Sequence, residues 1–449
     1  MSDTIVQVDC PWSRVGRPSV FRRSVPLSTS QRLGLPMHLC VLGRESIFGI
    51  LQSMDSGSPS LKAARPIAVA LCSWTRIRPQ PLRALLTGVL ILLSAAITKG
   101  ATLTVSPDGA GQFRTIQAAL DASRRDDVIE LLPGTFTGPG NRGLRFPGWD
   151  LTLWSRDNDP QSCVIDCEDA DLGFRMDRGE SNATLIRGIT FRRGRSPIAG
   201  GAVIWGSSPT IENCRFIENT CVNGIGGGAL NLYSAGSVIE NCHFEANWSR
   251  LGGGAVYVTT DPAPWFIECS FVENECESEP FYSASVLYCD ECSPILERCT
   301  AYSNHASLGS LLLALRGATP RVISTTLARN RGDAVLFSVF GSTVWVENSI
   351  IAFNESVSNL CDADISVSCS DIFGNEGGDW VECLQGQEGS NGNLHLDPQF
   401  CLPEFDDFHL QAGSPCDADC GLMGAWGVGC SPPVPVANSS WGRVKLQFR

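Results

Sequence analysis

The hydrophobic pattern between residues 181 and 375 is a tandem repeat with no sustained helical period. Its clearest copies run from cysteine through phenylalanine to asparagine, at Cys214–Asn219, Cys242–Asn247 and Cys269–Asn274. Looser copies follow at 299–304, 325–330, 349–354 and 370–375. The asparagine spacing varies from 21 residues (354 to 375) to 30 (274 to 304). A fixed frame with a drifting period indicates constant strands joined by variable loops.

A glycine-rich motif precedes each of these copies, at Gly200–Val203, Gly227–Leu230 and Gly253–Val256. Each repeat then consists of a turn, a short strand, a loop, a short strand, a second turn and a short strand. If the last residue of each glycine motif faces inward, the alternation of a strand predicts which neighbours face outward. These outward residues are Ile204, Asn231, Tyr233, Tyr257 and Thr259.

One coil cannot bury its own apolar residues, so the repeats must stack. Ile211, Cys214 and Phe216 all point inward if Glu212 and Asn213 form a two-residue turn. Coils stacked about 4.8 Å apart then bury these groups against their own copies. The sequence therefore predicts an all-β protein, a parallel β-helix. Its aromatic and aliphatic column comprises Phe191, Phe216, Phe244, Phe271, Leu327, Ile351 and Ile372.

Two further columns, one of asparagine and one of cysteine, accompany the apolar one. Asn213, Asn241 and Asn348 recur at the tight turn, where asparagine tolerates a left-handed backbone. A cysteine column comprises Cys214, Cys242, Cys269 and Cys299. Coil spacing permits disulfides within it, but we favour small apolar fillers. For the pair Cys289 and Cys292 we expect a disulfide rather than half of a zinc site.

The segment before the repeats predicts export. Three arginines (76, 78 and 83) precede an apolar run from Ala84 to Ala96 and a small-residue exit, which is typical of a secretory signal peptide at 76–100. We expect residues 1–75 to be disordered or translated upstream of the true start. Of 20 cysteines, 17 follow the signal, a density typical of an oxidising compartment. The 17 cannot all pair with one another.

Charge and lysine content narrow the partners. Residues 1–100 hold 12 basic and 4 acidic residues, so the rest holds 22 basic and 43 acidic, a net charge of −21. Such a chain is a poor match for nucleic acid. The only lysines are Lys62, Lys99 and Lys445.

We expect a secreted or surface-displayed monomer without a transmembrane span in the mature chain. Its domains would be a β-helix at 101–430 and a Pro-rich linker and tail at 431–449.

The two repeat motifs resemble those of the polymorphic outer membrane protein family over Gly200–Asn274. That resemblance implies a right-handed parallel β-helix on a bacterial surface, and a C-terminal membrane barrel for which this sequence has no strands. The segments 105–109, 113–120 and 128–136 resemble the pectin-lyase-like superfamily more broadly. This second resemblance implies a short N-terminal capping helix, with Thr115 as N-cap and Ile116, Ala119 and Leu120 closing the solenoid. Residues 397–425 resemble the closing segment of bacterial β-helix repeat proteins.

Several members of such folds are polysaccharide lyases, hydrolases or esterases, so catalytic residues must be sought directly. The absence of lysine between residues 101 and 430 excludes a lysine-base lyase. The Asn-Thr-Asp, Asp-Asp, Gly-His-Gly and Arg-Ile-Lys motifs of polygalacturonase-like enzymes and the Gln-Asp-Thr motif of methylesterases are missing. The four histidines of the body, at 243, 305, 395 and 409, share no repeat position and read as structural. Arg215, stacked near Glu218 and Glu245, reads as a solvated charge ladder. No catalytic residue is predicted.

Binding is better supported than catalysis. Aromatic rings flanked by amides suit sugar rings, so Asn231, Tyr233, Tyr257 and Thr259 are the candidate ligand-binding residues. An ordinary exposed strand is the alternative. The sequence favours a structural or adhesive protein that contacts a polysaccharide or cell-surface glycan. The competing hypothesis is a polysaccharide-active enzyme with an unfamiliar site, assisted by Ca²⁺ at carboxylates such as Asp166, Glu168 and Asp169; no other cofactor or metal is predicted.

Overall fold

The computed structural model describes residues 100–261, 263–277, 282–358, 364–418 and 420–430. The expected N-terminal extension (1–75), nearly all of the signal segment (76–100) and the C-terminal tail (431–449) lie outside these residues. No helix in the described part of the chain has both the length and the apolar character needed to span a bilayer.

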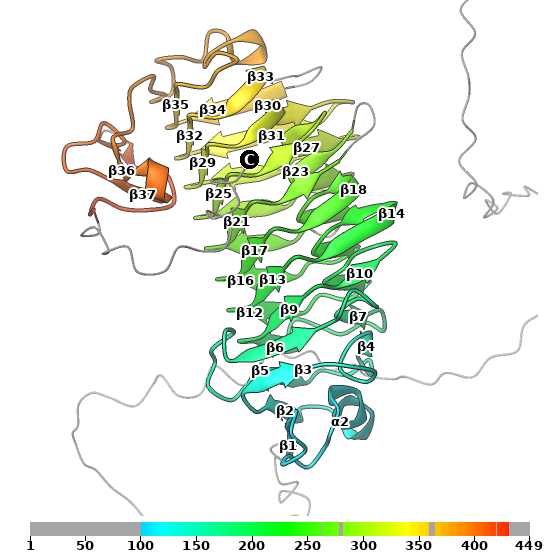
Figure 1. The fold of residues 1–449 in the computed structure, drawn as a ribbon. Helices are drawn as coiled ribbons and strands as arrows, with labels where there is room; N and C mark the ends of the chain where they lie inside the picture. The colour runs from blue at the N-terminus through cyan, green and yellow to red at the C-terminus, as the bar shows by residue number, and fades with distance from the viewer. Residues whose placement is uncertain (1–99, 262, 278–281, 359–363, 419, 431–449) are drawn as a thin grey trace, which may run out of the picture. The chain divides into compact units, whose positions relative to one another are not determined.

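Three long parallel sheets run the length of a solenoid, and each coil adds a strand to sheet A, then to sheet B, then one or two to sheet C (Figure 1). The prediction of a parallel β-helix is confirmed. Sheet A comprises β1 (Thr102–Val105), β2 (Val128–Leu131), β5 (Thr152–Ser155), β8 (Leu185–Arg187), β12 (Thr210–Glu212), β16 (Val238–Glu240), β20 (Trp265–Ile267), β24 (Ile295–Glu297), β28 (Arg321–Ile323), β31 (Thr343–Glu347) and β34 (Asp364–Ser368).

Sheet B comprises β3 (Gly134–Phe136), β6 (Cys163–Asp166), β9 (Thr190–Arg192), β13 (Arg215–Ile217), β17 (His243–Glu245), β21 (Ser270–Val272), β25 (Thr300–Tyr302), β29 (Thr326–Ala328), β32 (Ile350–Ala352) and β35 (Asp371–Phe373). Sheet C comprises β4 (Leu144–Arg145), β7 (Phe174–Met176), β10 (Arg195–Ser196), β11 (Ala202–Trp205), β14 (Thr220–Gly227), β15 (Leu230–Tyr233), β18 (Trp248–Gly253), β19 (Val256–Thr259), β22 (Glu275–Cys276), β23 (Ala284–Asp290), β26 (His305–Ala306), β27 (Ser310–Leu315), β30 (Arg331–Ser338) and β33 (Glu355–Ser358).

A short helix lies at the N-terminal end of the solenoid, as predicted (Figure 1). This helix, α2, spans Ile116–Ala122 and begins at Thr115, whose hydroxyl accepts a hydrogen bond from the Ala118 amide at 3.3 Å. Its Ile116, Ala119 and Leu120 side chains are fully buried in the main core. The helix therefore covers the apolar interior where no further coil does.

Stacked phenylalanines form the centre of the core. Phe216 lies 5.4 Å from Phe191 and 5.2 Å from Phe244 between ring centroids, and Phe244 lies 4.8 Å from Phe271. The strand registers continue this column through Leu327, Ile351 and Ile372, with Ala301 between. The predicted interior column is confirmed.

A buried asparagine ladder runs beside the phenylalanines. In each coil the side-chain oxygen accepts from the backbone amide and the side-chain amide of the preceding coil's asparagine, for instance Asn304 from Asn274 at 2.9 Å each. The Asn304 side-chain amide in turn donates to the Phe271 carbonyl and to the next asparagine, Asn330. The ladder runs from Asn219 to Asn375, where Asp379 accepts the last amide.

The tight turn between sheets A and B adopts the predicted left-handed backbone. The φ angles of Asn213, Asn241 and Asn348 are 49°, 51° and 48°. The Asn213 side-chain amide donates to the Asn158 carbonyl, which ties the turn to the loop between β5 and β6, two coils earlier.

Cysteine serves mainly as a buried filler. Cys214, Cys242, Cys269 and Cys299 are unpaired and at most 1% exposed, as favoured from the sequence. Burial raises the pKa of Cys242 and Cys269 well above the usual value, so these thiols stay neutral. In contrast, the expected disulfide between Cys289 and Cys292 is not formed: both are free, buried cysteines packed into the core.

After the last coil the chain folds back onto the outer face of sheet B (Figure 1). This C-terminal segment, residues 397–430, contains an antiparallel pair, β36 (Phe400–Leu402) and β37 (Asp407–Leu410), and a smaller one, β38 (Asp417–Ala418) and β39 (Gly421–Leu422). The short 3-10 turns are η1 (Glu382–Leu384) and η2 (Pro403–Phe405). Five apolar side chains of the C-terminal segment pack on Ala328, Ile350 and Ala352 of sheet B: Phe400, Phe408, Leu410, Cys416 and Met423.

Two disulfides fix the C-terminal segment. Cys369–Cys420 ties it to the last coils, and Cys401–Cys430 closes it upon itself. Cys383 is also disulfide-bonded. The two disulfides lie at the C-terminal end, whereas all the free buried cysteines of the described residues except Cys416 lie in the coils of the solenoid.

Candidate functional site

The four predicted binding residues lie on the outer face of sheet C. The alternate residues of β15 and β19 are in the core, which places Asn231, Tyr233, Tyr257 and Thr259 on the opposite side. The register sets Asn231 beside Tyr257 and Tyr233 beside Thr259. Tyr233 is 36% exposed, whereas Asn231 is only 7% exposed and offers little surface.

The neighbouring strand β11 presents a tryptophan that the sequence-based prediction missed. Ala202 pairs with Leu230, so Ala202 and Ile204 are in the core and Val203 and Trp205 point outward. The expected directions of Val203 and Ile204 were therefore wrong. Glycine has no side chain to fix the register of the preceding turn, and a slip of one residue reverses both faces of a strand.

Four aromatic side chains form two packed pairs in neighbouring columns, here called the aromatic ledge: Trp205 with Tyr233, and Tyr257 with Tyr288, which is only 8% exposed. Trp205 is 56% exposed and packs against Tyr233 with ring centroids 4.5 Å apart. Tyr257 and Tyr288 stack at 4.8 Å in the adjacent column. Burial raises the pKa of Tyr257 to about 12, so its ring carries a neutral hydroxyl at physiological pH. The ledge can stack against planar or apolar faces and donate hydrogen bonds.

An ion pair ends the ledge. Asp290 follows Thr259 in the same column and is only 2% exposed. The Arg316 guanidinium donates to it at 2.7 Å and is itself largely exposed. Burial raises the pKa of Asp290, and Arg316 opposes that shift. The pair places a positive group at the exposed surface and keeps its carboxylate covered.

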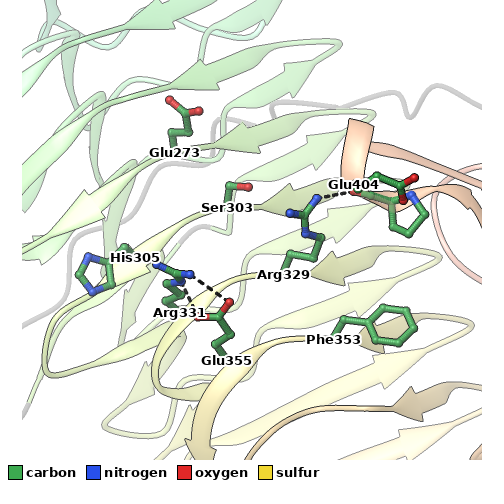
Figure 2. Close-up of a pocket in the computed structure, with 9 residues that line it drawn as sticks. Glu273, Ser303, His305, Arg329, Arg331, Phe353, Glu355 and Glu404 are labelled. Carbon is green, nitrogen blue, oxygen red and sulfur yellow. Dashed lines mark hydrogen bonds and ion pairs between the residues drawn. The ribbon is translucent and has the colours of Figure 1, made fainter. Parts of the chain in front are cut away.

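A second candidate site is a polar pocket of about 660 Å³ between the sheet B edge and the C-terminal segment (Figure 2). It is lined by Glu273, Ser303, His305, Arg329, Arg331, Phe353, Glu355, Pro403 and Glu404.

The repeat itself builds one wall of this pocket. Glu273, Ser303, Arg329 and Phe353 each precede a ladder asparagine and have φ between 52° and 57°. His305, Arg331 and Glu355 each follow one, and they stack in register. Two surface columns thus flank the buried asparagines, and successive coils supply different chemistry at equivalent positions.

The charges in the polar pocket are already engaged. Arg331 donates to Glu355 at 2.6 Å, as the dashed lines of Figure 2 show. The Arg329 guanidinium donates to the Pro403 carbonyl and lies 3.5 Å from Asp406. A ligand in the pocket would meet hydrogen-bond donors from cationic side chains and acceptors from anionic ones, which suits a polar neutral group better than an anion.

The outer face of sheet B carries a chain of hydrogen-bonded side chains. The Ser270 hydroxyl lies 2.6 Å from His243 Nδ1, and His243 Nε2 lies 3.1 Å from Glu245 Oε2. Arg215 donates to the same Glu245 oxygen at 3.0 Å. The hydrogen bond from His243 lowers the pKa of Glu245, so this carboxylate is ionised. The predicted Arg215–Glu245 proximity is confirmed, whereas Glu218 belongs to the turn column.

The signal for this chain was present in the sequence. Arg215, His243 and Ser270 each follow the cysteine of their repeat and stack in register. The column cannot be found from the positions of the histidines alone, because the neighbours of His243 in it are an arginine and a serine.

Two of the three carboxylates suggested for Ca²⁺, those of Asp166 and Glu168, already have arginine partners. Asp166 is 2% exposed and accepts from Arg192 and Arg193 at 2.9 Å and 2.6 Å. Glu168 accepts from Arg142. Within the described ranges no group of three or more His, Cys, Asp or Glu side chains could hold a metal ion. The Ca²⁺ hypothesis at Asp166, Glu168 and Asp169 therefore has no support from their geometry.

Comparison with known proteins bears on the fold. No curated protein matches the chain. Among solved structures, pectate lyase Pel9A is similar with 16% identity and a TM-score of 0.41, covering 74% of this chain and 98% of that one. Pectin methylesterase from carrot covers 67% and 90% at 12% identity and a TM-score of 0.35. Pectin methylesterase from Aspergillus niger covers 66% and 90% at 14% identity and a TM-score of 0.37.

A family model described as a right handed beta helix region matches residues 200–383. This range contains the best-ordered repeats and most of the coils that carry the aromatic ledge, the polar pocket and the Ser270–His243 contact. Together with the parallel sheets, the match establishes a right-handed parallel β-helix in this chain.

Proposed function

We propose that the protein is an exported β-helix that binds a carbohydrate polymer along the aromatic ledge of sheet C. The observation that carries this proposal is the packed Trp205–Tyr233 pair, whose rings are 56% and 36% exposed on the outer face. Leaving large aromatic surfaces in water is unfavourable, and exposed aromatic groups of this kind mark interaction sites.

The geometry of the solenoid favours an extended ligand. Stacked coils repeat about every 4.8 Å, so equivalent side chains form a row parallel to the solenoid axis. The rings of Trp205 and Tyr233 lie on adjacent strands of that row, and Tyr257 and Tyr288 continue it in the neighbouring column. Sugar rings present apolar faces and hydroxyl rims, which match aromatic faces beside hydroxyl and amide groups.

Export is supported by separate features. The signal-like segment at 76–100 precedes the described fold, and the disulfides Cys369–Cys420 and Cys401–Cys430 belong to an oxidising compartment. We therefore place the protein outside the cytosol, as a secreted or surface-displayed monomer with a structural or adhesive role. The net charge of −21 after residue 100 favours a neutral glycan over an acidic one.

A glycan array probed with the native protein, followed by affinity measurement on the best ligand, tests the proposal. We expect Trp205→Ala and Tyr233→Ala each to weaken binding about 5- to 20-fold, since one stacked ring contributes about 1–2 kcal/mol. Trp345→Ala is the matched control, because Trp345 is 43% exposed but lies on sheet A. An array without ligands, or ledge variants that bind as well as the native protein, would overturn the proposal.

A further inference from the structure

The Ser270, His243 and Glu245 side chains have the connectivity of a nucleophile, a base and a group that orients the base. We propose that they form an acyl-transfer site that hydrolyses carboxylic esters. Ser270 is the nucleophile, His243 the general base, and Glu245 the positioning residue. The argument rests on sheet B and is independent of carbohydrate binding on sheet C.

The hydrogen-bond chain fixes the proton positions. The ionised Glu245 can only accept, so the Nε2 of His243 carries the hydrogen and donates to it. In the neutral form of the ring the Nδ1 nitrogen is then an acceptor, and the Ser270 hydroxyl can donate to it across the 2.6 Å contact. That arrangement is what removal of the serine proton requires.

Glu245 is held in place from two sides. Its Oε2 accepts from His243 at 3.1 Å and from Arg215 at 3.0 Å. The side chains of Arg215, His243 and Glu245 are 28%, 29% and 34% exposed, so the chain is half-buried and still reachable from solvent. The positive charge of Arg215 balances the negative charge of Glu245 and holds this carboxylate in place. The carboxylate in turn orients the imidazole of His243.

The site lies beside the C-terminal segment. Tyr302, on the coil after Ser270, packs against Phe408 of that segment with centroids 5.2 Å apart. The column beyond Ser270 continues with Thr300, which is only 4% exposed. The strand that carries Ser270 ends at Val272, and the next residue, Glu273, lines the polar pocket. A substrate at Ser270 therefore has an apolar wall and a polar cavity next to it.

The reaction proceeds in two balanced steps. Ser270 Oγ bonds to the ester carbonyl carbon while its proton passes to His243 Nδ1; the carbon–oxygen bond to the alcohol then breaks, and the alcohol leaves with that proton. Water, giving a proton to the same nitrogen, attacks the acyl-serine; the acid departs, and the proton returns to Ser270. No oxidant or cofactor enters.

The test uses p-nitrophenyl acetate and a fluorophosphonate probe on the full chain. We expect hydrolysis with a burst of one nitrophenol per protein, and mass-spectrometric mapping of the probe to Ser270. Ser270→Ala and His243→Gln should each lower kcat/KM at least 100-fold. Glu245→Gln should lower kcat more than it raises KM and should change the pH profile, because the imidazole then lacks its anionic partner.

Ser366→Ala is the control, since Ser366 lies in mid-strand on sheet A with no histidine beside it in the register. It should leave both hydrolysis and labelling unchanged. Absence of labelling at Ser270 in the native protein, or hydrolysis that survives Ser270→Ala, would overturn the proposal. Labelling of the native protein does not depend on how the variants fold. Neither readout involves a glycan, so loss of carbohydrate binding would not affect the result.

Discussion

At the scale of single residues, the asparagine that follows each sheet B strand does the most to hold one coil to the next. Each such side chain joins three coils, because it accepts from the backbone of the coil before and donates both to a carbonyl of that coil and to the asparagine of the coil after. Buried polar groups of this kind stabilise a fold only while every donor and acceptor is satisfied.

Asn304→Ala should lower the free energy of unfolding by about 3–5 kcal/mol, because it leaves Asn274, Phe271 and Asn330 with unsatisfied buried groups. Chemical denaturation measures this loss. Asn241→Gly is the control, since the turn asparagine has φ 51° and glycine adopts that backbone freely. A loss below about 1 kcal/mol for Asn304→Ala would contradict a structural role of the ladder.

Residue columns could be predicted from the sequence wherever the repeat frame is strict. The phenylalanine, cysteine and turn-asparagine columns follow from spacing alone, because stacking requires equivalent side chains at equivalent depth. Trp205 was missed since the glycines before it leave the register open by one residue. Ser270 and His243 were missed because Arg215, His243 and Ser270, at successive positions of their column, are of three different residue types.

At the scale of elements, the C-terminal segment decides which part of sheet B is available. It covers the outer face at Ala328, Ile350 and Ala352 and leaves β17 exposed at its border. This placement could not be predicted, because an irregular segment has no periodicity to indicate its partner, and cysteine spacing does not reveal pairing. The Cys369–Cys420 disulfide closes a loop with a sequence separation of 51 residues.

Attachment of the C-terminal segment should depend on pH through Asp371. This buried carboxylate accepts from the Leu396 amide at 3.1 Å and from the Cys416 thiol at 3.4 Å, and burial raises its pKa to about 6. The folded state therefore holds this proton more tightly than the unfolded chain, whose pKa is about 3.9. The contribution of Asp371 to the free energy of unfolding is fully present below about pH 4. It falls by roughly 3 kcal/mol as the pH rises through about 6.

Thermal unfolding of the native protein and of Asp371→Asn between pH 4 and 7 checks this expectation. The variant should lose the part of the decline that belongs to Asp371, since an amide does not ionise. His395, whose pKa is raised by its hydrogen bonds to Glu388 and Asp379, also contributes stability that is lost as pH rises, and His395→Gln separates its part. Equal pH dependence in the native protein and Asp371→Asn would show that Asp371 is not responsible.

At the scale of the whole molecule, each coil contacts only its neighbours, so damage should remain local. Phe244 is fully buried between Phe216 and Phe271. Phe244→Ala should cost about 3–5 kcal/mol through the cavity it leaves. Hydrogen exchange should rise in β13, β17 and β21 and stay unchanged in β2 and β34. Phe340→Ala, at a site 59% exposed, serves as the control. A uniform rise along the chain would indicate a single cooperative unit instead.

The left-handed position before each ladder asparagine has a consequence for redesign. Glutamate, serine, arginine and phenylalanine occupy it at 273, 303, 329 and 353 with nearly the same φ. The adjoining asparagine, anchored above and below, keeps the backbone in shape whatever side chain stands there. Substitutions at these positions should therefore change the chemistry of the pocket wall one side chain at a time, while the backbone beneath keeps its conformation.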